Sequence, residues 1–485
     1  MMNETTDSPP RSEIFDAVVI GAGAAGLVTA SGAALLGARV ALIEKASFGG
    51  ECLWTGCVPS KALIRTAKTL HDARNAGAVG LVSTNIPFDF AQVLDSMREV
   101  IARIEPHDHP ETIQRKGVTT IHGAAEILGP GRIAVDGDEL ATKRVVIATG
   151  SRPVVPPIAN LEDTGYVTHE GIFALDQRPD RLIVLGAGPI GLEMAQVFRR
   201  LGTAVTVVEM TDTILPREDI EMSGHLQRAM EEEGIHFLLG HTAETARRVE
   251  QGKEVTARGP DASVVRVTGD EILVATGMRP FTKSLGLERI GVETDARGAI
   301  RVDRTLRTTA RRVWAAGDVT GTLLFTHVAD YQARLVVRNM FFPFPAKADY
   351  SRVPWAIFTD PTLARVGLTE SEARQRHGDR IGVYRYNLDN LDRAITDRAA
   401  RGLVKLIADK RGYLLGGHVV ADSADALIHE VALAMRARVK IGALSQMVHV
   451  YPTWSEGLRR AADSYYARLF ANSKFRPLIR WWARR

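Results

Sequence analysis

The feature that most constrains the fold is a glycine-rich unit that occurs twice in the chain. In the first copy a hydrophobic run leads into Gly21-Ala-Gly23-Ala-Ala-Gly26 and a segment of small residues, and a second hydrophobic run ends at Glu44. Strand, tight turn, helix, strand and acid within about thirty residues are typical of a dinucleotide-binding β-α-β unit. The glycines let the backbone approach a pyrophosphate, which lies at the amino terminus of the helix.

The second copy repeats the first at the same spacing. Gly186, Gly188 and Gly191 form its turn, and its closing strand ends at Glu209. The acid follows the first glycine by 23 residues in both copies, and in both we expect it to accept hydrogen bonds from a ribose. Two such sites predict two bound nucleotides, and hydride transfer between them is the economical reason for holding both in one chain.

Three further predicted strands end in short motifs that we expect at the carboxyl edges of the sheets. Each unit is followed by a hydrophobic run that ends in Ala-Thr-Gly, at Gly150 and at Gly277. A third run, from Val313, ends at Asp318. An acid at the carboxyl edge of a doubly wound sheet lies where such sheets bind ligands, and there it could hold the ribityl chain of a flavin.

The two cysteines of the chain lie five positions apart, at Cys52 and Cys57, with Lys61 four positions later. In a regular α-helix such residues have Cα atoms about 8–9 Å apart, whereas a disulfide needs about 4.4–6.8 Å. The pair therefore needs a distorted turn, which Gly56 can supply, and Pro59 sets it at the start of a helix. A helix amino terminus lowers a thiol pKa, which predicts a redox-active pair. A two-thiol metal site is the alternative; it lacks the further ligands of a closed site, and we predict no metal site.

Composition narrows the class of protein. The chain is 45% hydrophobic and 24% charged, and its net charge of +4 is too small to argue for nucleic-acid binding. Residues 1–14 are polar and carry no recognisable signal peptide, so we expect a reducing, cytoplasmic setting. Residues 17–38 contain no charge and would pass a transmembrane window, but glycines at motif spacing favour a buried β-α-β unit.

The pattern changes after a proline-containing boundary at 341–345. Alternating runs at 403–407 and 413–420 predict strands, and 424–438 predicts an amphipathic helix, together an α+β domain without a glycine turn. The tail, residues 474–485, is basic and aromatic. It suits either an interfacial membrane anchor or an exposed terminus, and it is too short to span a bilayer.

Together these motifs resemble the FAD-dependent pyridine nucleotide-disulfide oxidoreductases, a family that includes dihydrolipoamide dehydrogenase, glutathione reductase and mercuric reductase. The resemblance covers about residues 14–470. It implies a homodimeric α/β flavoprotein with two Rossmann-like domains, for FAD and NAD(P), and a carboxy-terminal α+β dimerisation domain. The implied parts are a disordered lead-in (1–13), an FAD domain (14–155 and 280–346), an NAD(P) domain (156–279), a dimerisation domain (347–470) and a basic aromatic tail (471–485).

The resemblance also implies roles for individual residues. Contacts to FAD would come from Gly21, Gly23, Gly26, Glu44, Gly50, Lys61, Thr149, Gly150 and Asp318. Contacts to the nicotinamide nucleotide would come from Gly186, Gly188, Gly191, Glu209 and Gly277. Cys57 would be the charge-transfer thiol beside the flavin and Cys52 the interchange thiol that faces the substrate. Lys61 would lie near the reactive nitrogen of the flavin and pair with Glu193.

The nucleotide preference follows from charge. Glu209 suits a free 2′-hydroxyl and repels a 2′-phosphate. Gly191 completes the turn where NADPH-using relatives often carry alanine. Arg217 lies nearby in the sequence and could tolerate a phosphate, so NADH is favoured without NADPH being excluded.

The family pattern breaks at the carboxy-terminal motif. Members that reduce disulfides read His-Pro-Thr-x-x-Glu there, and the histidine acts as acid and base across the dimer. Here the motif runs from Tyr451 to Glu456, and a tyrosine with a reference pKa near 10 is a poor base at neutral pH. His449 is a candidate substitute, about 6–7 Å along an extended chain. Tyrosine also occurs in this segment in mercuric reductases, whose metal-ion substrate needs no proton relay.

The leading hypothesis is therefore an NAD(P)H oxidoreductase that passes electrons through FAD and the Cys52–Cys57 pair to a metal ion or an unidentified oxidised acceptor. The chain lacks the carboxy-terminal cysteine pair of a full mercuric reductase, which argues against efficient Hg(II) reduction. One alternative is a dihydrolipoamide dehydrogenase with an altered acid/base. Another is a membrane-surface flavoprotein that passes electrons to a quinone or a protein.

Overall fold

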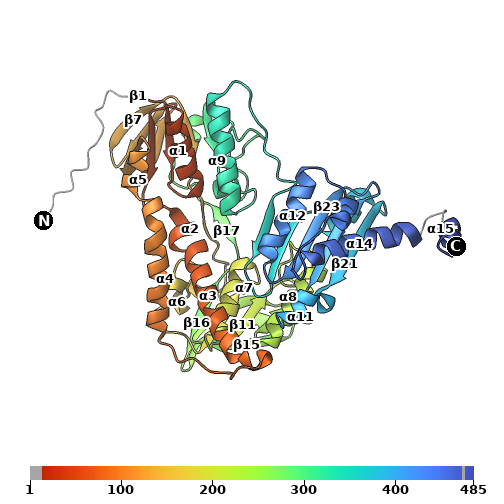
Figure 1. Cartoon of the computed structure of the whole chain (residues 1–485). Coiled ribbons are helices and arrows are strands. Elements are labelled where there is room, and N and C mark those ends of the chain that lie inside the picture. The colour runs from red at the N-terminus through yellow and green to blue at the C-terminus, as the bar shows by residue number, and fades with distance from the viewer. Residues whose placement is uncertain (1–13, 472–475, 485) are drawn as a thin grey trace.

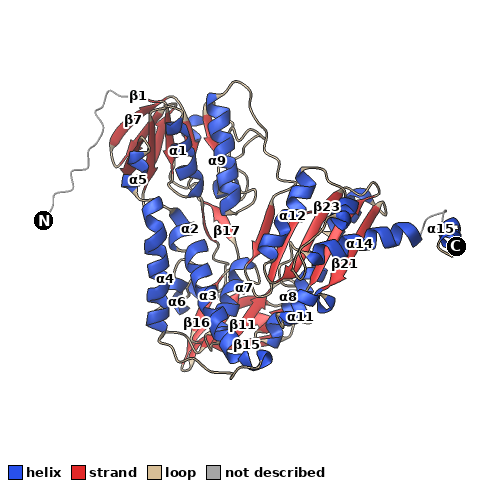
Figure 2. Ribbon diagram, in the orientation of Figure 1, coloured by secondary structure: helices blue, strands red, loops and turns tan. Residues whose placement is uncertain are grey.

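The computed structural model describes residues 14–471 and 476–484. Two parallel sheets and a five-stranded antiparallel sheet, each with helices packed on it, divide the chain into three parts (Figures 1 and 2). This mixed α/β architecture confirms the predicted fold class. The domain boundaries given above stay predictions.

The first unit is a five-stranded parallel sheet in the order β18-β8-β2-β3-β4. Helix α1 (Ala24–Leu35) connects β2 to β3 and packs on α9 (Thr326–Phe341). The approach is close at Gly32, where a Cβ would lie 3.2 Å from the side chain of Val337. The uncharged stretch 17–38 is thus a buried strand and helix, and within the described ranges no helix is long and apolar enough to cross a membrane. The strands are β2 (Ala17–Ile20), β3 (Val40–Glu44), β4 (Val118–His122), β8 (Val145–Ile147) and β18 (Val313–Ala315).

The second unit repeats this plan with four parallel strands in the order β12-β11-β10-β16. An antiparallel sheet of β13, β14 and β15 covers one of its faces through a shared apolar cluster. The strands are β10 (Arg181–Leu185), β11 (Ala204–Glu209), β12 (His236–Leu239), β13 (Thr242–Val249), β14 (Gly252–Arg258), β15 (Val264–Gly269) and β16 (Glu271–Val274), and the helices are α6 (Leu161–Thr164), α7 (Pro189–Arg200) and α8 (Ile220–Glu232).

Two short antiparallel strands connect the units. The chain leaves the first unit through β9 (Ser151–Pro153) and returns through β17 (Met278–Pro280), with Arg152 opposite Arg279. A small four-stranded sheet adjoins the first unit, formed by β1 (Ile14–Phe15), β5 (Ala125–Gly129), β6 (Arg132–Val135) and β7 (Asp138–Thr142).

The carboxy-terminal part is a five-stranded antiparallel sheet in the order β19-β20-β23-β22-β21. The predicted helix at 424–438 is present as α12 (Ala424–Arg436). The strands predicted at 403–407 and 413–420 are present too, but their side chains are almost all buried, because helices such as α12 and α8 cover the sheet. The elements are β19 (Pro354–Ile357), β20 (Thr362–Gly367), β21 (Ile381–Asn387), β22 (Leu403–Asp409), β23 (Leu414–Ala421), α10 (Glu370–His377), α11 (Asp392–Thr396), α13 (Ile441–Gln446), α14 (Glu456–Ala471) and α15 (Arg476–Trp482).

The cysteines lie on two consecutive helices, α2 (Gly50–Trp54) and α3 (Cys57–Arg74). Leu63, Ala67 and Leu70 anchor α3 in the largest apolar cluster, together with residues of α4 (Phe90–Ile104) and α7. The short helix α5 (Pro110–Arg115) follows α4. Helix α3, which begins at Cys57, is therefore fixed between the two parallel-sheet units.

Candidate active site

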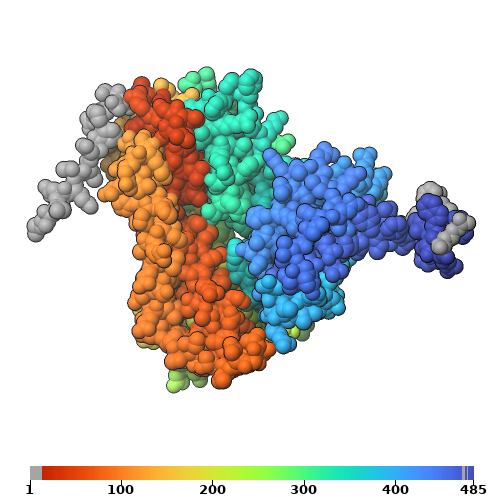
Figure 3. All heavy atoms as spheres, viewed as in Figure 1, coloured from red at the N-terminus to blue at the C-terminus, as the bar shows by residue number. Residues whose placement is uncertain are grey.

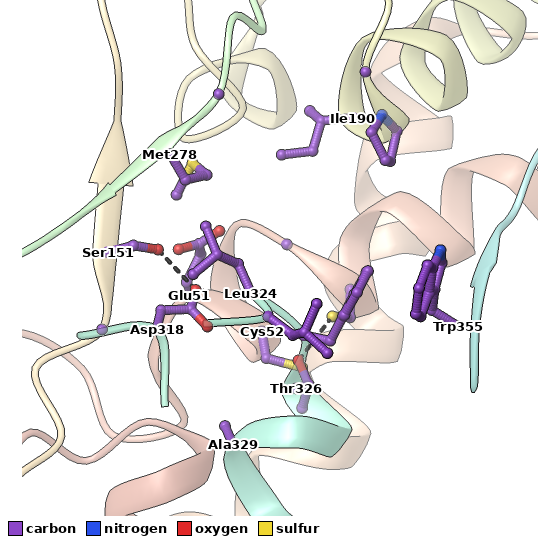
Figure 4. A pocket seen from close by; sticks show the side chains of 18 of the residues that line it. Glu51, Cys52, Ser151, Ile190, Met278, Asp318, Leu324, Thr326, Ala329 and Trp355 are labelled. Atoms are coloured by element: carbon purple, nitrogen blue, oxygen red, sulfur yellow. Dashed lines mark hydrogen bonds between the residues drawn. The ribbon is translucent and has the colours of Figure 1, made fainter. Parts of the chain in front are cut away.

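A cavity of about 2530 Å³ collects most of the residues singled out from the sequence. Both glycine turns, both closing acids and both cysteines line it, as do Lys61, Glu193 and Asp318. Figure 4 shows its centre, where side chains of both units and of β19 converge. The sequence repeat and the cysteine pair thus belong to one site.

The first glycine turn leaves space only where a ligand would lie. Gly21 has a φ of +102°, and a Cβ there would lie 2.4 Å from the carbonyl oxygen of Ala148. A Cβ at Gly26 would lie 1.7 Å from the carbonyl oxygen of Gly21, so the helix rests directly on the turn. A Cβ at Gly23 would meet no atom within 4 Å. The open space lies at the amino terminus of α1, which favours a phosphate.

The second turn has nearly the same geometry. Gly186 has a φ of +104°, and a Cβ at Gly191 would lie 2.2 Å from the carbonyl oxygen of Gly186. In both copies the closing acid accepts a backbone hydrogen bond from the residue after the first glycine: Glu44 from Ala22 at 2.7 Å, and Glu209 from Ala187 at 2.8 Å. Each carboxylate keeps lone pairs for a ribose hydroxyl.

The irregular turn between the cysteines agrees with the prediction from their spacing. Cys57 is the first residue of α3, and Cys52 lies in the preceding short helix. A Cβ at Gly56 would lie 2.9 Å from the carbonyl oxygen of Glu51, so the glycine permits a close backbone approach. Both cysteines are free thiols; Cys57 is open to the cavity and Cys52 is half-buried.

The two thiols differ strongly in acidity. A hydrogen bond from Cys52 lowers the pKa of Cys57 to about 6, and Thr326 and the charge of Lys61 act in the same direction. The same hydrogen bond, together with burial, raises the pKa of Cys52 far above its usual range. The Oγ1 atom of Thr326, at the start of α9, lies 3.3 Å from the sulfur of Cys57. At neutral pH the pair therefore carries a thiolate at Cys57 and a thiol at Cys52.

Lys61 and Glu193 form the ion pair that the resemblance implied. Lys61 Nζ lies 2.8 Å from Glu193 Oε2 and 4.4 Å from the centre of the Phe358 ring. The other carboxylate oxygen of Glu193 accepts a hydrogen bond of 2.9 Å from the backbone N–H of Phe358. Glu193 is buried, so α3, α7 and the segment after β19 together hold the lysine ammonium at the cavity wall.

Residues 358–360, which we call the bridging segment, contain an acid that the sequence analysis missed. Asp360 Oδ2 lies 2.9 Å from Lys68 Nζ of α3 and 3.0 Å from a guanidinium nitrogen of Arg200 of α7. These two cations hold the pKa of Asp360 well below its usual range, against the effect of burial. Gln196 bonds both the backbone N–H and the carbonyl oxygen of Asp360. The bridging segment is thus fixed to both helices that carry the Lys61–Glu193 pair.

The predicted flavin-ribityl residue, Asp318, follows β18 at the carboxyl edge of the first sheet. Its Oδ2 accepts a hydrogen bond of 2.8 Å from Ser151 (Figure 4). Burial raises the pKa of Asp318 to about 6. The remaining predicted cofactor contacts also line the cavity: Gly50, Thr149, Gly150 and Gly277.

The carboxy-terminal motif does not join this site within one chain. Tyr451 is 65% exposed, lies outside the cavity and donates a hydrogen bond of 2.9 Å to Asp392. Glu456 is buried at the start of α14, where it accepts a hydrogen bond from Arg459. The ring of His449 is turned inward, with Nε2 3.2 Å from Glu430. A contact between these residues and Cys52 would need a second chain.

The sequence analysis also missed a buried histidine in the cavity wall that pairs with a half-buried glutamate. His169 Nε2 lies 3.0 Å from Glu51 Oε1, close enough for an ion pair but without hydrogen-bond geometry. Near the thiols, Phe325 stacks on His327 and on Trp355, with ring centres 5.3 and 5.7 Å apart. Such residues carry no local motif, and no signal in the sequence would have identified them.

Known proteins resemble this chain over nearly its whole length. It is 36% identical over 461 residues to a mercuric reductase of Streptomyces lividans, which covers 93% of this chain and 96% of the relative. It is 34% identical over 465 residues to dihydrolipoyl dehydrogenase 3 of Haloarcula marismortui, with the same coverage. A solved Cu(II) complex of the HOCl-induced flavoprotein disulfide reductase RclA from Escherichia coli has a TM-score of 0.83 at 30% identity, covering 93% of this chain and 99% of that one.

Two family models divide the chain between them. The model for pyridine nucleotide-disulphide oxidoreductases matches residues 15–333, and the model for their dimerisation domain matches residues 353–462. These ranges contain both glycine turns, the cysteine pair and the antiparallel sheet. The chain therefore belongs to the pyridine nucleotide-disulphide oxidoreductase family, and it is an FAD-type flavoprotein oxidoreductase with a dimerisation domain.

Proposed function

We propose that this chain is an NAD(P)H-dependent flavoprotein reductase whose Cys52–Cys57 pair delivers electrons to a thiophilic metal ion. The observation that carries this proposal is a polarised thiol pair in a chain with tyrosine, and no histidine, at position 451. A metal ion takes electrons from thiolates without releasing a thiolate that must be protonated, so it does not need that base. Mercuric reductases and a reductase solved with Cu(II) are among the similar proteins.

The cavity fits FAD, the cofactor that membership of the family supports. The space in front of Gly23 suits a pyrophosphate, and the half-buried Asp318, which lines the cavity, suits a ribityl hydroxyl. When bound, FAD would take a hydride from NAD(P)H and pass its electron pair to a disulfide. We assign its contacts to Gly21, Gly23, Gly26, Glu44, Gly50, Lys61, Thr149, Gly150 and Asp318.

Lys61 has an electrostatic role in this proposal. Its ammonium is held by Glu193 and by the Phe358 ring at the wall of the cavity. A fixed cation beside the cofactor stabilises negative charge as the electron pair arrives, and it needs no reorganisation to do so. Its charge also lowers the pKa of Cys57.

The electron balance defines what the thiols do. Two electrons and two protons convert the Cys52–Cys57 disulfide to two thiols, which lose their protons when they bind a metal ion. Hg(II) accepts both electrons and leaves as Hg(0), whereas Cu(II) accepts one, so two Cu(II) ions are reduced to Cu(I) in each cycle. In both cases the disulfide forms again and is ready for the next pair of electrons.

We assign the nicotinamide nucleotide to the second unit, at Gly186, Gly188, Gly191, Glu209 and Gly277. NADH is favoured, because the carboxylate of Glu209 would repel a 2′-phosphate. Arg217 also lines the cavity, and its charge would reduce the penalty for NADPH. Comparison of KM for NADH and NADPH tests this assignment directly, and equal values would contradict it.

An anaerobic acceptor screen tests the proposed function. The reduced enzyme would be mixed separately with Hg(II), Cu(II), lipoamide and a soluble quinone while NADH oxidation is followed. We expect the highest rate with a metal ion, and no metal-dependent rate in a matched variant with both cysteines changed to serine. A quinone rate that exceeds the metal rate and survives in that variant would overturn the proposal.

A dihydrolipoamide dehydrogenase activity is the second candidate. Dihydrolipoyl dehydrogenases are among the similar proteins, and Glu456 of the family motif is retained. Tyr451 in the place of the usual base argues for a slow reaction. A steady-state rate with dihydrolipoamide that exceeds the metal-ion rate would favour this candidate.

A further inference from the structure

A basic and aromatic arm, which we define as residues 464–485, lies beyond the matched family region, which ends at residue 462. The last turns of α14 project away from the body of the molecule, and α15 lies at their far end (Figures 1 and 3). The proposed reduction of a metal ion makes no use of this arm.

The arm carries charge of only one sign. In the sequence it has six basic residues and no aspartate or glutamate; Arg468, Arg476, Arg480 and Arg484 are among the described residues, and Lys474 and Arg485 lie outside them. The whole chain has a net charge of only +4, so the arm concentrates positive charge far beyond the average of the molecule. Such a cluster recognises an anionic surface.

The arm also exposes large apolar side chains next to these cations. Trp482 is 70% exposed, and Leu469, Phe470, Ile479 and Trp481 are each 40–53% exposed. Residues of α14 and α15, among them Phe470 and Ile479, line a shared shallow depression. Arg476, Ile479 and Arg480 all line this depression, so cations and an apolar side chain lie next to each other on one side of α15.

We propose that this arm docks the enzyme onto an anionic lipid surface. Tryptophan, phenylalanine and isoleucine would enter the boundary between headgroups and acyl chains, and the arginines would lie at the depth of the phosphates. The six basic residues leave the arm no continuous apolar stretch that could span a bilayer, so the attachment is peripheral and reversible. A homodimer presents two arms, which strengthens binding through avidity.

The chemistry of the arm favours lipid over other anionic partners. Duplex nucleic acid offers phosphates but no apolar phase for Leu469, Phe470 and Trp482. A second arm would bring six more positive charges and repel the first. An anionic bilayer supplies both the charge and the apolar phase that the arm exposes.

Vesicle co-sedimentation of the full-length holoenzyme tests the proposal, with phosphatidylcholine vesicles compared with vesicles that also contain phosphatidylglycerol. We expect binding only to the anionic vesicles, and we expect it to weaken as salt is added. Each basic residue near such a surface contributes about a fivefold factor, so R476E/R480E should lower partitioning by at least about 25-fold. W482S should lower it as well, because the apolar contribution is lost.

The matched control is R98E/R103E, which makes the same change of charge on α4, on the opposite side of the molecule (Figure 1). This variant should bind anionic vesicles like the unaltered enzyme. The NADH-dependent reductase rate in solution should be the same in all variants, which separates docking from catalysis. Equal sedimentation of R476E/R480E and the unaltered enzyme would overturn the proposal. Absence of vesicle binding, or arm-dependent binding to DNA instead, would overturn it too.

Discussion

The two sides of the cysteine pair are built in different ways. The flavin side, which we define as Lys61, Glu193 and the bridging segment, is assembled by one chain from α3, α7 and the loop after β19. The acceptor side, which we define as Tyr451 and Glu456, lies apart from the cavity in the same chain. One side is closed by buried contacts, whereas the other presents an exposed tyrosine.

The two sides therefore differ in how far one folded chain determines their part of the proposed reaction. In the reaction that we propose, the flavin side needs a cation at one fixed point, and the contacts of Glu193 with Lys61 and with Phe358 hold it there. The acceptor side would depend on the exposed Tyr451 and on a second chain, so a substitution of Tyr451 would change the acceptor at little cost to folding.

Loss of the Cys57 thiolate should have the largest effect on the absorption spectrum and on the rate of acceptor reduction. In Cys57→Ser the group that faces the flavin no longer ionises, so we expect the long-wavelength charge-transfer band to disappear after anaerobic addition of NADH. Acceptor reduction should fall by at least about a hundredfold. Absorption spectra and steady-state rates measure both effects.

The matched variant for this test is Cys52→Ser. It should also lose acceptor reduction, because both thiols are needed, but it should keep the band, since Cys57 retains its charge. A band of equal strength in the two serine variants would refute the assignment of Cys57 as the flavin-side thiol.

Restoring the usual histidine at position 451 should raise the lipoamide rate relative to the metal-ion rate. In Tyr451→His a group with a pKa near 6.5 replaces a phenol, and we expect lipoamide turnover to rise about tenfold or more. The metal-ion rate should change little, since no proton relay is needed. Tyr451→Phe serves as the control, and an unchanged lipoamide rate in the histidine variant would show that Tyr451 does not face the partner's thiols.

Removing the charge of Glu193 on the flavin side should have a moderate effect on the rate of flavin reduction. In Glu193→Gln the hydrogen bond to Phe358 N–H can persist, while Lys61 loses its ionic partner. We expect flavin reduction by NADH to slow about tenfold, or ~1.4 kcal/mol in the barrier. The free energy of unfolding should fall by at most about 1 kcal/mol, because water screens the half-buried Lys61. Stopped-flow absorbance and thermal melting separate the two effects, and an unchanged reduction rate would remove Glu193 from the flavin side.

Substitution of Thr326 should have the smallest effect, a shift in the pH at which the charge-transfer band appears. Its hydroxyl helps to lower the pKa of Cys57 to about 6, so the charge-transfer band of the reduced enzyme should be present above that pH and lost below it. In Thr326→Val the midpoint should rise by about one pH unit, because one hydrogen bond to the thiolate is lost. A pH titration of the band measures the midpoint, and Thr326→Ser should leave it in place. An unchanged midpoint in the valine variant would exclude this contact.

The glycine turns and the cysteine helix were predictable because their signals are local. The spacing of Gly21, Gly26 and Glu44 encodes a turn, a close helix contact and a closing hydrogen bond within one short stretch. Gly56 and the cysteine spacing likewise required an irregular turn before α3. The glycine contacts are set by local backbone geometry, and the hydrogen bond of Glu44 follows from the pairing of two strands within one β-α-β unit.

The residues that the sequence analysis missed contact partners that lie far away in the sequence. Thr326 reaches Cys57 across 269 positions, and Asp360 reaches Lys68 across 292. Neither contact can be read from spacing, because it depends on how three parts of the chain pack. Tyr451 is a different case: its motif was recognised, but its proposed target belongs to a second chain.

The pairing of β9 with β17 brings the two ends of the second unit together, so this unit is a self-contained insert, which we call the cassette. The chain leaves and returns on neighbouring strands, joined further by backbone hydrogen bonds from Val154 to Gly277 and from Phe281 to Gly150. Because the two ends of the cassette meet, its replacement would leave the flanking strands of the first sheet where they are. With the nicotinamide nucleotide assigned to this unit as proposed above, a lineage could exchange its reductant by replacing one insert, while the first sheet and the two cysteine-bearing helices were inherited unchanged.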